Sequence, residues 1–231
     1  MKNKISKALI DALFPPRCIL CDEIIAPNRY LCNYCHTKIL KVGDKRCAGC
    51  GRSINRCNCN RFVYHFDGVI SPFYNEGPAK QAFYQYKFFR YRRTAEFYAI
   101  NMAESVKEYY QDIKFDFLTY VCSSDRKPLF DHCKILADEL SNQLELELVE
   151  LLKPSSKKRS VQHTLGFENR FENVHNAYEV KSLCKNKVIL LVDDIKTSGA
   201  TIDECARIMK IAGAKAVYCV TALVGNTRNK H

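Results

Sequence analysis

The stretch 188–201, which reads VILLVDDIKTSGAT, restricts the chain to few folds. Its apolar first half, 188–192, is typical of a strand that is buried on both faces of a parallel sheet. Apolar residues recur at helical spacing after residue 201, which predicts an amphipathic helix. A buried strand that passes through a short loop into a helix indicates an α/β domain.

The loop between this strand and this helix has the composition of a phosphate site. Gly199 lets the backbone approach an anion, the neighbouring hydroxyls donate hydrogen bonds, and the helix directs its positive end to the same point. Asp193 and Asp194, at the carboxyl end of the strand, can accept hydrogen bonds from vicinal hydroxyls. A sugar 5-phosphate satisfies both halves. The predicted phosphate-binding residues are Lys196, Thr197, Ser198, Gly199, Ala200 and Thr201.

This stretch resembles the PRPP-binding signature of type I phosphoribosyltransferases. The resemblance implies a type I phosphoribosyltransferase-like parallel sheet flanked by helices, with Asp193 and Asp194 as catalytic and PRPP-binding residues and Mg²⁺ bound together with PRPP. The stretch is not a Walker loop, because it lacks GKS or GKT and its acids precede the loop. Two capping acids before an ordinary helix would be a simpler interpretation, but it leaves the TSGAT loop unexplained.

Eight of the thirteen cysteines precede residue 60 and stand in closely spaced pairs. A C-x-x-C turn places two thiolates on one edge of a zinc tetrahedron, and a second turn closes the site. Taken in order, the first two pairs form one site and the last two another, although an interleaved pairing is also open. We predict structural zinc, one or two ions. The predicted ligands are Cys18, Cys21, Cys32, Cys35, Cys47, Cys50, Cys57 and Cys59.

The cysteine pairs also divide the chain. We expect a zinc-binding module over 1–61, too small to fold without its metal, and a phosphoribosyltransferase-like domain over 62–231. In the second domain we expect a hairpin within 62–74 that joins the two domains. We also expect helices over 77–88, up to about 110 and over 129–144, and strands over 115–122, 146–151 and 216–222.

Charge and hydropathy bear on compartment and partners. No apolar run reaches the roughly 18 residues that span a membrane, and the N-terminus lacks a secretory signal pattern, so we expect a cytoplasmic protein. In that reducing compartment clustered cysteines favour metal over disulfides. Eight thiolates and two zinc ions would lower the formal net charge from +11 to about +7, which still favours a polyanionic partner.

Two basic segments are candidates for nucleic-acid binding. Aromatic residues alternate with bases around 83–93, a pattern that can stack on single-stranded nucleic acid, and 153–162 is a basic loop. Core aromatics with a solvated basic edge, and a plain solvated connection, are the alternatives. The candidate residues are Lys87, Arg90, Arg92, Arg93, Lys157, Lys158 and Arg159.

The whole chain resembles the ComF family, in which a double zinc ribbon precedes a type I phosphoribosyltransferase-like domain. The cysteine pairs, the YKF segment 86–88, Gln162 and the segment 170–178 carry the resemblance. Members are implicated in natural competence, so the resemblance implies PRPP or another ribose 5-phosphate, single-stranded DNA, and competence or DNA-processing proteins as partners. The alternatives are an active phosphoribosyltransferase of nucleotide metabolism and a PRPP-sensing regulator that binds nucleic acid.

One segment departs from the family pattern. The family has V-P-V-P, then basic residues and R-G-F-N-Q, whereas this chain reads YVCSSDRKPLFDH over 120–132. The prolines of the first element are missing, and in phosphoribosyltransferases that element forms the loop that holds pyrophosphate. Ser123 and Ser124 can still form an anion loop here, and we count both as candidate PRPP-binding residues.

Overall fold

The computed structural model describes residues 13–57, 59, 63–89, 92–123, 131–155 and 167–225. Its elements are α2 (Asn33–Lys38), a 3₁₀ turn η1 (Ile54–Arg56), β1 (Gly68–Ile70), β2 (Phe73–Tyr74), α3 (Gly77–Phe89), α4 (Arg92–Tyr109), β3 (Phe117–Tyr120), α5 (His132–Leu144), β4 (Leu152–Pro154), α6 (Phe167–Val174), β5 (Tyr178–Val180), β6 (Val188–Lys196), α7 (Ala200–Ile211) and β7 (Ala216–Val224).

A parallel sheet forms the centre of the molecule. Its strand order is β1-β7-β6-β3, and β2 also pairs with β7. The two long strands, β6 and β7, pair over their full length, from Val188 opposite Ala216 to Lys196 opposite Val224. The expected parallel sheet is therefore confirmed, and β6, α7 and β7 form the predicted strand–helix–strand unit.

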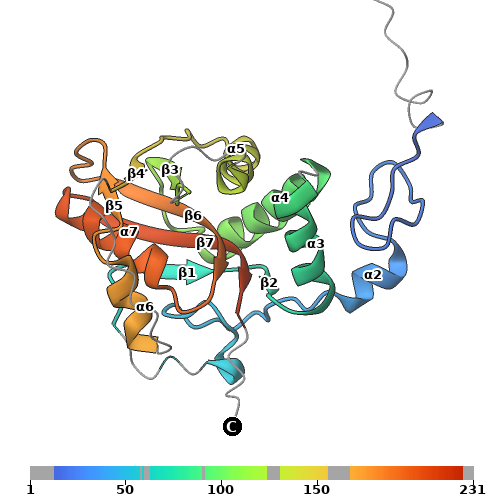
Figure 1. Ribbon diagram of the computed structural model, residues 1–231, viewed down its shortest axis with the longest axis horizontal. Helices are drawn as coiled ribbons and strands as arrows, with labels where there is room; N and C mark the ends of the chain where they lie inside the picture. Colours follow the sequence, from blue (N-terminus) through green and yellow to red (C-terminus); the bar gives the residue numbers. More distant parts are fainter. Residues whose placement is uncertain are drawn as a thin grey trace, which may run out of the picture.

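Helices cover both faces of this sheet because its strands are apolar on both sides. On one face Leu190 and Val192 pack in a core with buried residues of α3, α4 and α5. On the other face Ile189 and Leu191 pack with α7 and with the small antiparallel pair β4–β5. In Figure 1 the sheet has α7 on one side and α3 and α4 on the other.

Strand β6 is longer than predicted. The apolar run ends at Val192, but pairing with β7 continues through Asp193 and Ile195 to Lys196. The two acids therefore lie on the last part of the strand and not after it. Helix α7 begins at Ala200, with Gly199 at its N-cap in a left-handed conformation (φ 89°), close to the predicted start.

The expected hairpin within 62–74 is wrong. Strands β1 and β2 do not pair with each other; both pair in parallel with β7, one after the other along its edge. Pro72 lacks an N–H and so interrupts the ladder between them. The Ser71 hydroxyl is hydrogen-bonded to the hydroxyl of Thr221 on β7 (2.6 Å) and holds the chain to the same edge.

The strand that was predicted over 146–151 is only partly formed. The segment runs beside β3, where the Leu118 N–H donates to Glu147 and the Val149 N–H donates to Leu118, but this amounts to a single parallel bridge between Leu118 and Leu148. Strand β4 begins at Leu152 and pairs with β5 instead. Among the described residues, no helix is long and apolar enough to cross a membrane.

Candidate sugar-phosphate site and zinc centres

The two acids of β6 differ in their surroundings. The Asp193 carboxylate accepts a hydrogen bond from the Asp194 N–H (2.8 Å) and is 9% exposed. Burial raises the pKa of Asp193 well above its usual range, and the neighbouring charge of Asp194 raises it further. Because the environment of Asp193 disfavours ionisation, Asp194 carries the charge of the pair.

Two donors from other elements converge on Asp194. His132 Nε2, at the start of α5, lies 2.9 Å from Asp194 Oδ2, and Lys87 of α3 forms an ion pair with the same oxygen. Asp194 Oδ1 accepts a hydrogen bond from the Ile195 N–H. Burial by itself would raise the pKa of Asp194, but the hydrogen bond from His132 and the charge of Lys87 outweigh it and lower the pKa to about 2.

The loop after β6 brings donors and positive charge to one point. Thr197 is exposed, whereas Ser198 is buried and its hydroxyl accepts a hydrogen bond from the Ala200 N–H (3.3 Å) in the first turn of α7. A Cβ on Gly199 would lie 3.0 Å from Lys196 Cε and 3.2 Å from its Nζ. The ammonium of Lys196 therefore lies directly behind the loop.

Lys196 is unusually buried for a lysine. It is 2% exposed, and its Nζ lies 5.3 Å from the ring centroid of Tyr64. Burial, with a smaller contribution from the charge of Arg52, lowers the pKa of Lys196 to about 8. A buried cation and the N-terminus of α7 together make this loop suited to an anion.

The predicted β6–α7 residues are thus adjacent, and two more residues join them. His132 was not among the predicted site residues, because no partner stands near it in the chain, and Lys87 was predicted only as a candidate for nucleic-acid binding. Both contact Asp194. Ser123 follows β3, and its N–H donates to Asp131, the N-cap of α5 (3.4 Å). Ser124 lies outside the described residues.

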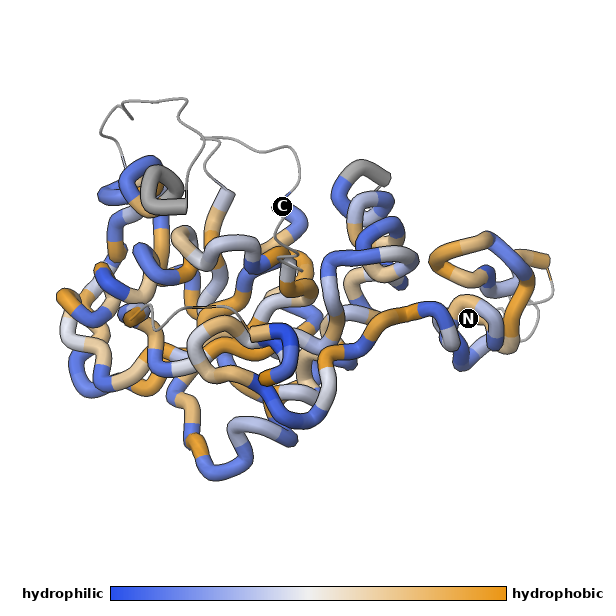
Figure 2. Tube along the Cα trace, turned by 90° about the horizontal axis from the view of Figure 1, so that it is seen from below, coloured by the Kyte–Doolittle hydropathy of each residue, from blue (hydrophilic) through white to orange (hydrophobic). Residues whose placement is uncertain are grey.

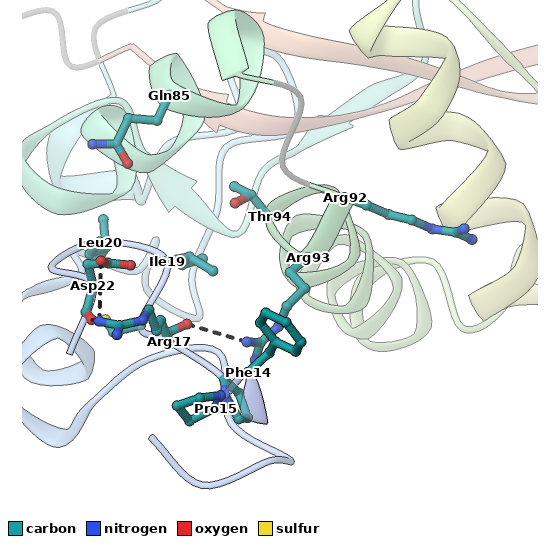
Figure 3. A pocket seen from close by; sticks show the side chains of 12 residues that line it. Phe14, Pro15, Arg17, Ile19, Leu20, Asp22, Gln85, Arg92, Arg93 and Thr94 are labelled. Carbon is teal, nitrogen blue, oxygen red and sulfur yellow. Dashed lines mark hydrogen bonds and ion pairs between the residues drawn. The ribbon is translucent and has the colours of Figure 1, made fainter. Parts of the chain in front are cut away.

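The other residues that were candidates for nucleic-acid binding have different surroundings. Arg92 pairs with Glu139 of α5 and is largely exposed. Arg93 donates to the backbone carbonyls of Arg17 and Arg29 (3.4 and 2.5 Å), as Figure 3 shows for Arg17. These bonds attach the segment that carries the first four cysteines to α4. Arg90, Lys157, Lys158 and Arg159 lie outside the described residues.

The eight cysteines form two groups in chain order. One contains Cys18, Cys21, Cys32 and Cys35, the other Cys47, Cys50, Cys57 and Cys59, and within each group the ligand atoms lie within 4.8 Å of one another. The sulfur–sulfur distances of 3.7 Å for Cys21–Cys32 and 3.6 Å for Cys50–Cys57 match the edge of about 3.8 Å in a tetrahedral zinc site with Zn–S bonds of about 2.3 Å. The sequential pairing is confirmed, and both groups fit structural zinc.

The two groups sit differently on the α/β domain. Buried cysteines of the first group pack on the apolar core beside α3 and α4, and a groove of about 540 Å³, lined by residues such as Phe14, Arg17 and Arg93, lies next to it. In Figure 2 this module stands beside the α/β domain. The second group lies against the sheet edge, where the Val69 N–H of β1 donates to Ala48 (3.0 Å).

Comparison with known families agrees with this geometry. A model of the double zinc ribbon domain matches residues 9–62, and a model of the phosphoribosyl transferase domain matches residues 131–231. The fold, the loop and the cysteine groups thus define a phosphoribosyltransferase-type α/β domain that carries a double zinc ribbon.

The resemblance to the ComF family is confirmed by two curated relatives. The chain is similar to competence protein ComFC of Streptococcus pneumoniae strain R6, with 27% identity over 203 residues, covering 81% of this chain and 84% of that protein. It is also similar to competence protein ComFC of Bacillus subtilis strain 168, with 22% identity over 232 residues, covering 86% and 90%.

Among solved structures, the L. donovani hypoxanthine-guanine phosphoribosyl transferase is 19% identical, with a TM-score of 0.37 over 56% of this chain and 71% of that chain.

Proposed function

We propose that this protein binds PRPP, or another ribose 5-phosphate, together with Mg²⁺ at the carboxyl end of β6, and that it serves natural competence in the cytoplasm by handling single-stranded DNA. The competence part follows from the similarity to two proteins named competence protein ComFC. The binding part rests on the structure of the β6–α7 junction.

One observation carries the binding proposal. The charged carboxylate of Asp194 and the start of α7 lie on either side of a loop that is only a few residues long, with the Lys196 ammonium behind it. A ribose 5-phosphate has vicinal hydroxyls at one end and a dianion at the other. The acids would accept hydrogen bonds from the hydroxyls, and the loop N–H groups would donate to the phosphate.

The test is isothermal titration of the zinc-loaded protein with PRPP and Mg²⁺. We expect Asp193→Asn with Asp194→Asn to remove binding, because amides are weaker acceptors for the ribose hydroxyls while they keep the shape of the acids. The matched control is Asp138→Asn, an exposed acid on α5, which should bind like the wild type. Equal affinity in the double variant would refute the ribose assignment.

Two further measurements separate the alternatives. Release of pyrophosphate in the presence of a nitrogen nucleophile would identify a transferase. Titration with single-stranded DNA at rising salt tests the competence part, since binding through phosphates must weaken steeply with salt. PRPP binding without any affinity for single-stranded DNA would contradict that part and leave the sugar-phosphate site in place.

A further inference from the structure

The second cysteine group reaches the predicted phosphate loop through two separate connections. We propose that this group, with its zinc bound, positions the loop 197–199 and thereby sets the affinity of the site for a sugar phosphate. The affinity part rests on the proposed function; the positioning part does not. The first group serves as the natural comparison, because it has the same chemistry and packs elsewhere.

Tyr64 makes the first connection. Its Oη donates to the Ser198 carbonyl (3.2 Å), and its ring edge lies 3.4 Å from the position of a Cβ on Gly199. On the cysteine side, the ring lies 3.9 Å from the position of a Cβ on Gly49, which stands between Cys47 and Cys50. The ring therefore fills the space between the zinc-binding turn and the loop.

Arg52 makes the second connection. It follows Cys50 by two residues, is 3% exposed, and its Nε donates to the Gly225 carbonyl (2.7 Å). Gly225 in turn donates its N–H to the Lys196 carbonyl (2.7 Å). This chain of hydrogen bonds ends on the residue whose ammonium lies behind the loop.

The turn that carries Arg52 is itself held in place. The Cys47 N–H donates to the Arg52 carbonyl and the Gly51 N–H to the Cys47 carbonyl (both 2.8 Å). Gly51 has φ 74°, and a Cβ there would lie 3.2 Å from the Val69 carbonyl of β1. The turn thus packs closely on the sheet, and we expect that loss of the metal, which joins the turn to Cys57 and Cys59, loosens the turn and the residues that it contacts.

Hydrogen exchange followed by mass spectrometry tests the positioning directly, with peptides that cover 193–203. Cys57→Ser with Cys59→Ser removes the second zinc, and Cys18→Ser with Cys21→Ser removes the first. We expect loop amides to exchange about tenfold faster in the second-site variant, as for the loss of one or two hydrogen bonds, and at the wild-type rate in the first-site variant. Equal loop exchange in both variants would overturn the proposal.

Ribose 5-phosphate titration tests the affinity. We expect the second-site variant to bind about tenfold or more weakly and the first-site variant to match the wild type. A wild type that binds neither ribose 5-phosphate nor PRPP with Mg²⁺ would refute the proposed function and the affinity part, while exchange still decides the positioning; a wild type that binds PRPP alone takes the same comparison of variants with PRPP.

A milder change covers the case in which the second-site variant does not fold. Tyr64→Phe keeps the ring and removes the hydrogen bond to Ser198. We expect about threefold to tenfold faster exchange of the loop. Tyr34→Phe, at an exposed tyrosine of the first group, is the matched control and should change nothing. Identical loop exchange in the Tyr64 and Tyr34 variants would remove the first connection from the proposal.

Discussion

The ion pair between Lys87 and Asp194 should contribute measurably to stability. The pKa of Asp194 falls from 3.8 to about 2 in spite of burial, and each unit corresponds to about 1.36 kcal/mol. After the cost of burial, the contacts of Asp194 with His132 and Lys87 therefore leave a net stabilisation of about 2 kcal/mol. We expect a coupling energy of about 1–2 kcal/mol for Lys87 in a double-mutant cycle of Lys87→Gln and Asp194→Asn.

The assay is urea denaturation at pH 7 in zinc-saturated buffer. Because the folded-state pKa of Asp194 is lowered, its contribution is fully present above pH 3.8 and is lost only as the pH falls through about 2. The control cycle uses Lys134→Gln and Glu150→Gln, an ion pair with side chains 44% and 45% exposed, whose coupling should stay below about 0.5 kcal/mol. Equal coupling in the two cycles would refute the assignment of Asp194 as a charged group held by Lys87.

Three shorter predictions concern the loop and the core. Lys196→Met should raise the free energy of unfolding at pH 7 by about 3 kcal/mol. Burial lowers the pKa of Lys196 from 10.5 to about 8, so the charged side chain destabilises the fold below pH 8. Urea denaturation at pH 7 and pH 10 should show that the stability gained by the Lys196→Met variant is smaller at pH 10. An equal gain at both pH values would contradict this account. Gly199→Ala should lower the unfolding free energy by about 1–3 kcal/mol. The loss should exceed that of Gly77→Ala, where φ is also positive but an added Cβ meets open space. Thermal denaturation in which Gly77→Ala is the more destabilised variant would contradict the contact with Lys196. Tyr98→Phe should cost about 1 kcal/mol in urea denaturation, because its buried hydroxyl donates to the Ala79 carbonyl, and no loss would mean that this bond is not formed.

The sequence predicted those parts of the structure that depend on residues close together in the chain. The run 188–192, the loop after it and the cysteine spacings each combine residues that are near in the chain, and the strand, the start of α7 and the two cysteine groups were predicted close to where they lie. The hairpin within 62–74 failed because alternation and a turn signal do not show which strand is the partner; both strands pair with β7.

The remaining site residues depend on contacts between distant parts of the chain. His132 meets Asp194 across 62 positions, Tyr64 meets Ser198 across 134, and Arg52 meets Gly225 across 173. No spacing rule connects such pairs. The one available signal was the YKF segment, whose Lys87 the family resemblance singled out without giving its partner.

The second cysteine group also bears on aggregation. Strand β1 is at one edge of the sheet, and exposed edge strands invite pairing between molecules. The segment before β1 covers this edge: Ala48, within the second cysteine group, accepts a hydrogen bond from the Val69 N–H of β1, and ahead of the group Leu40 accepts one from the Tyr74 N–H of β2, which pairs with the same strand, β7, while Lys41 forms a bridge with Phe73. A fragment that begins at residue 62 would expose these backbone groups and should self-associate, whereas a fragment that begins near residue 39 would keep its edge covered.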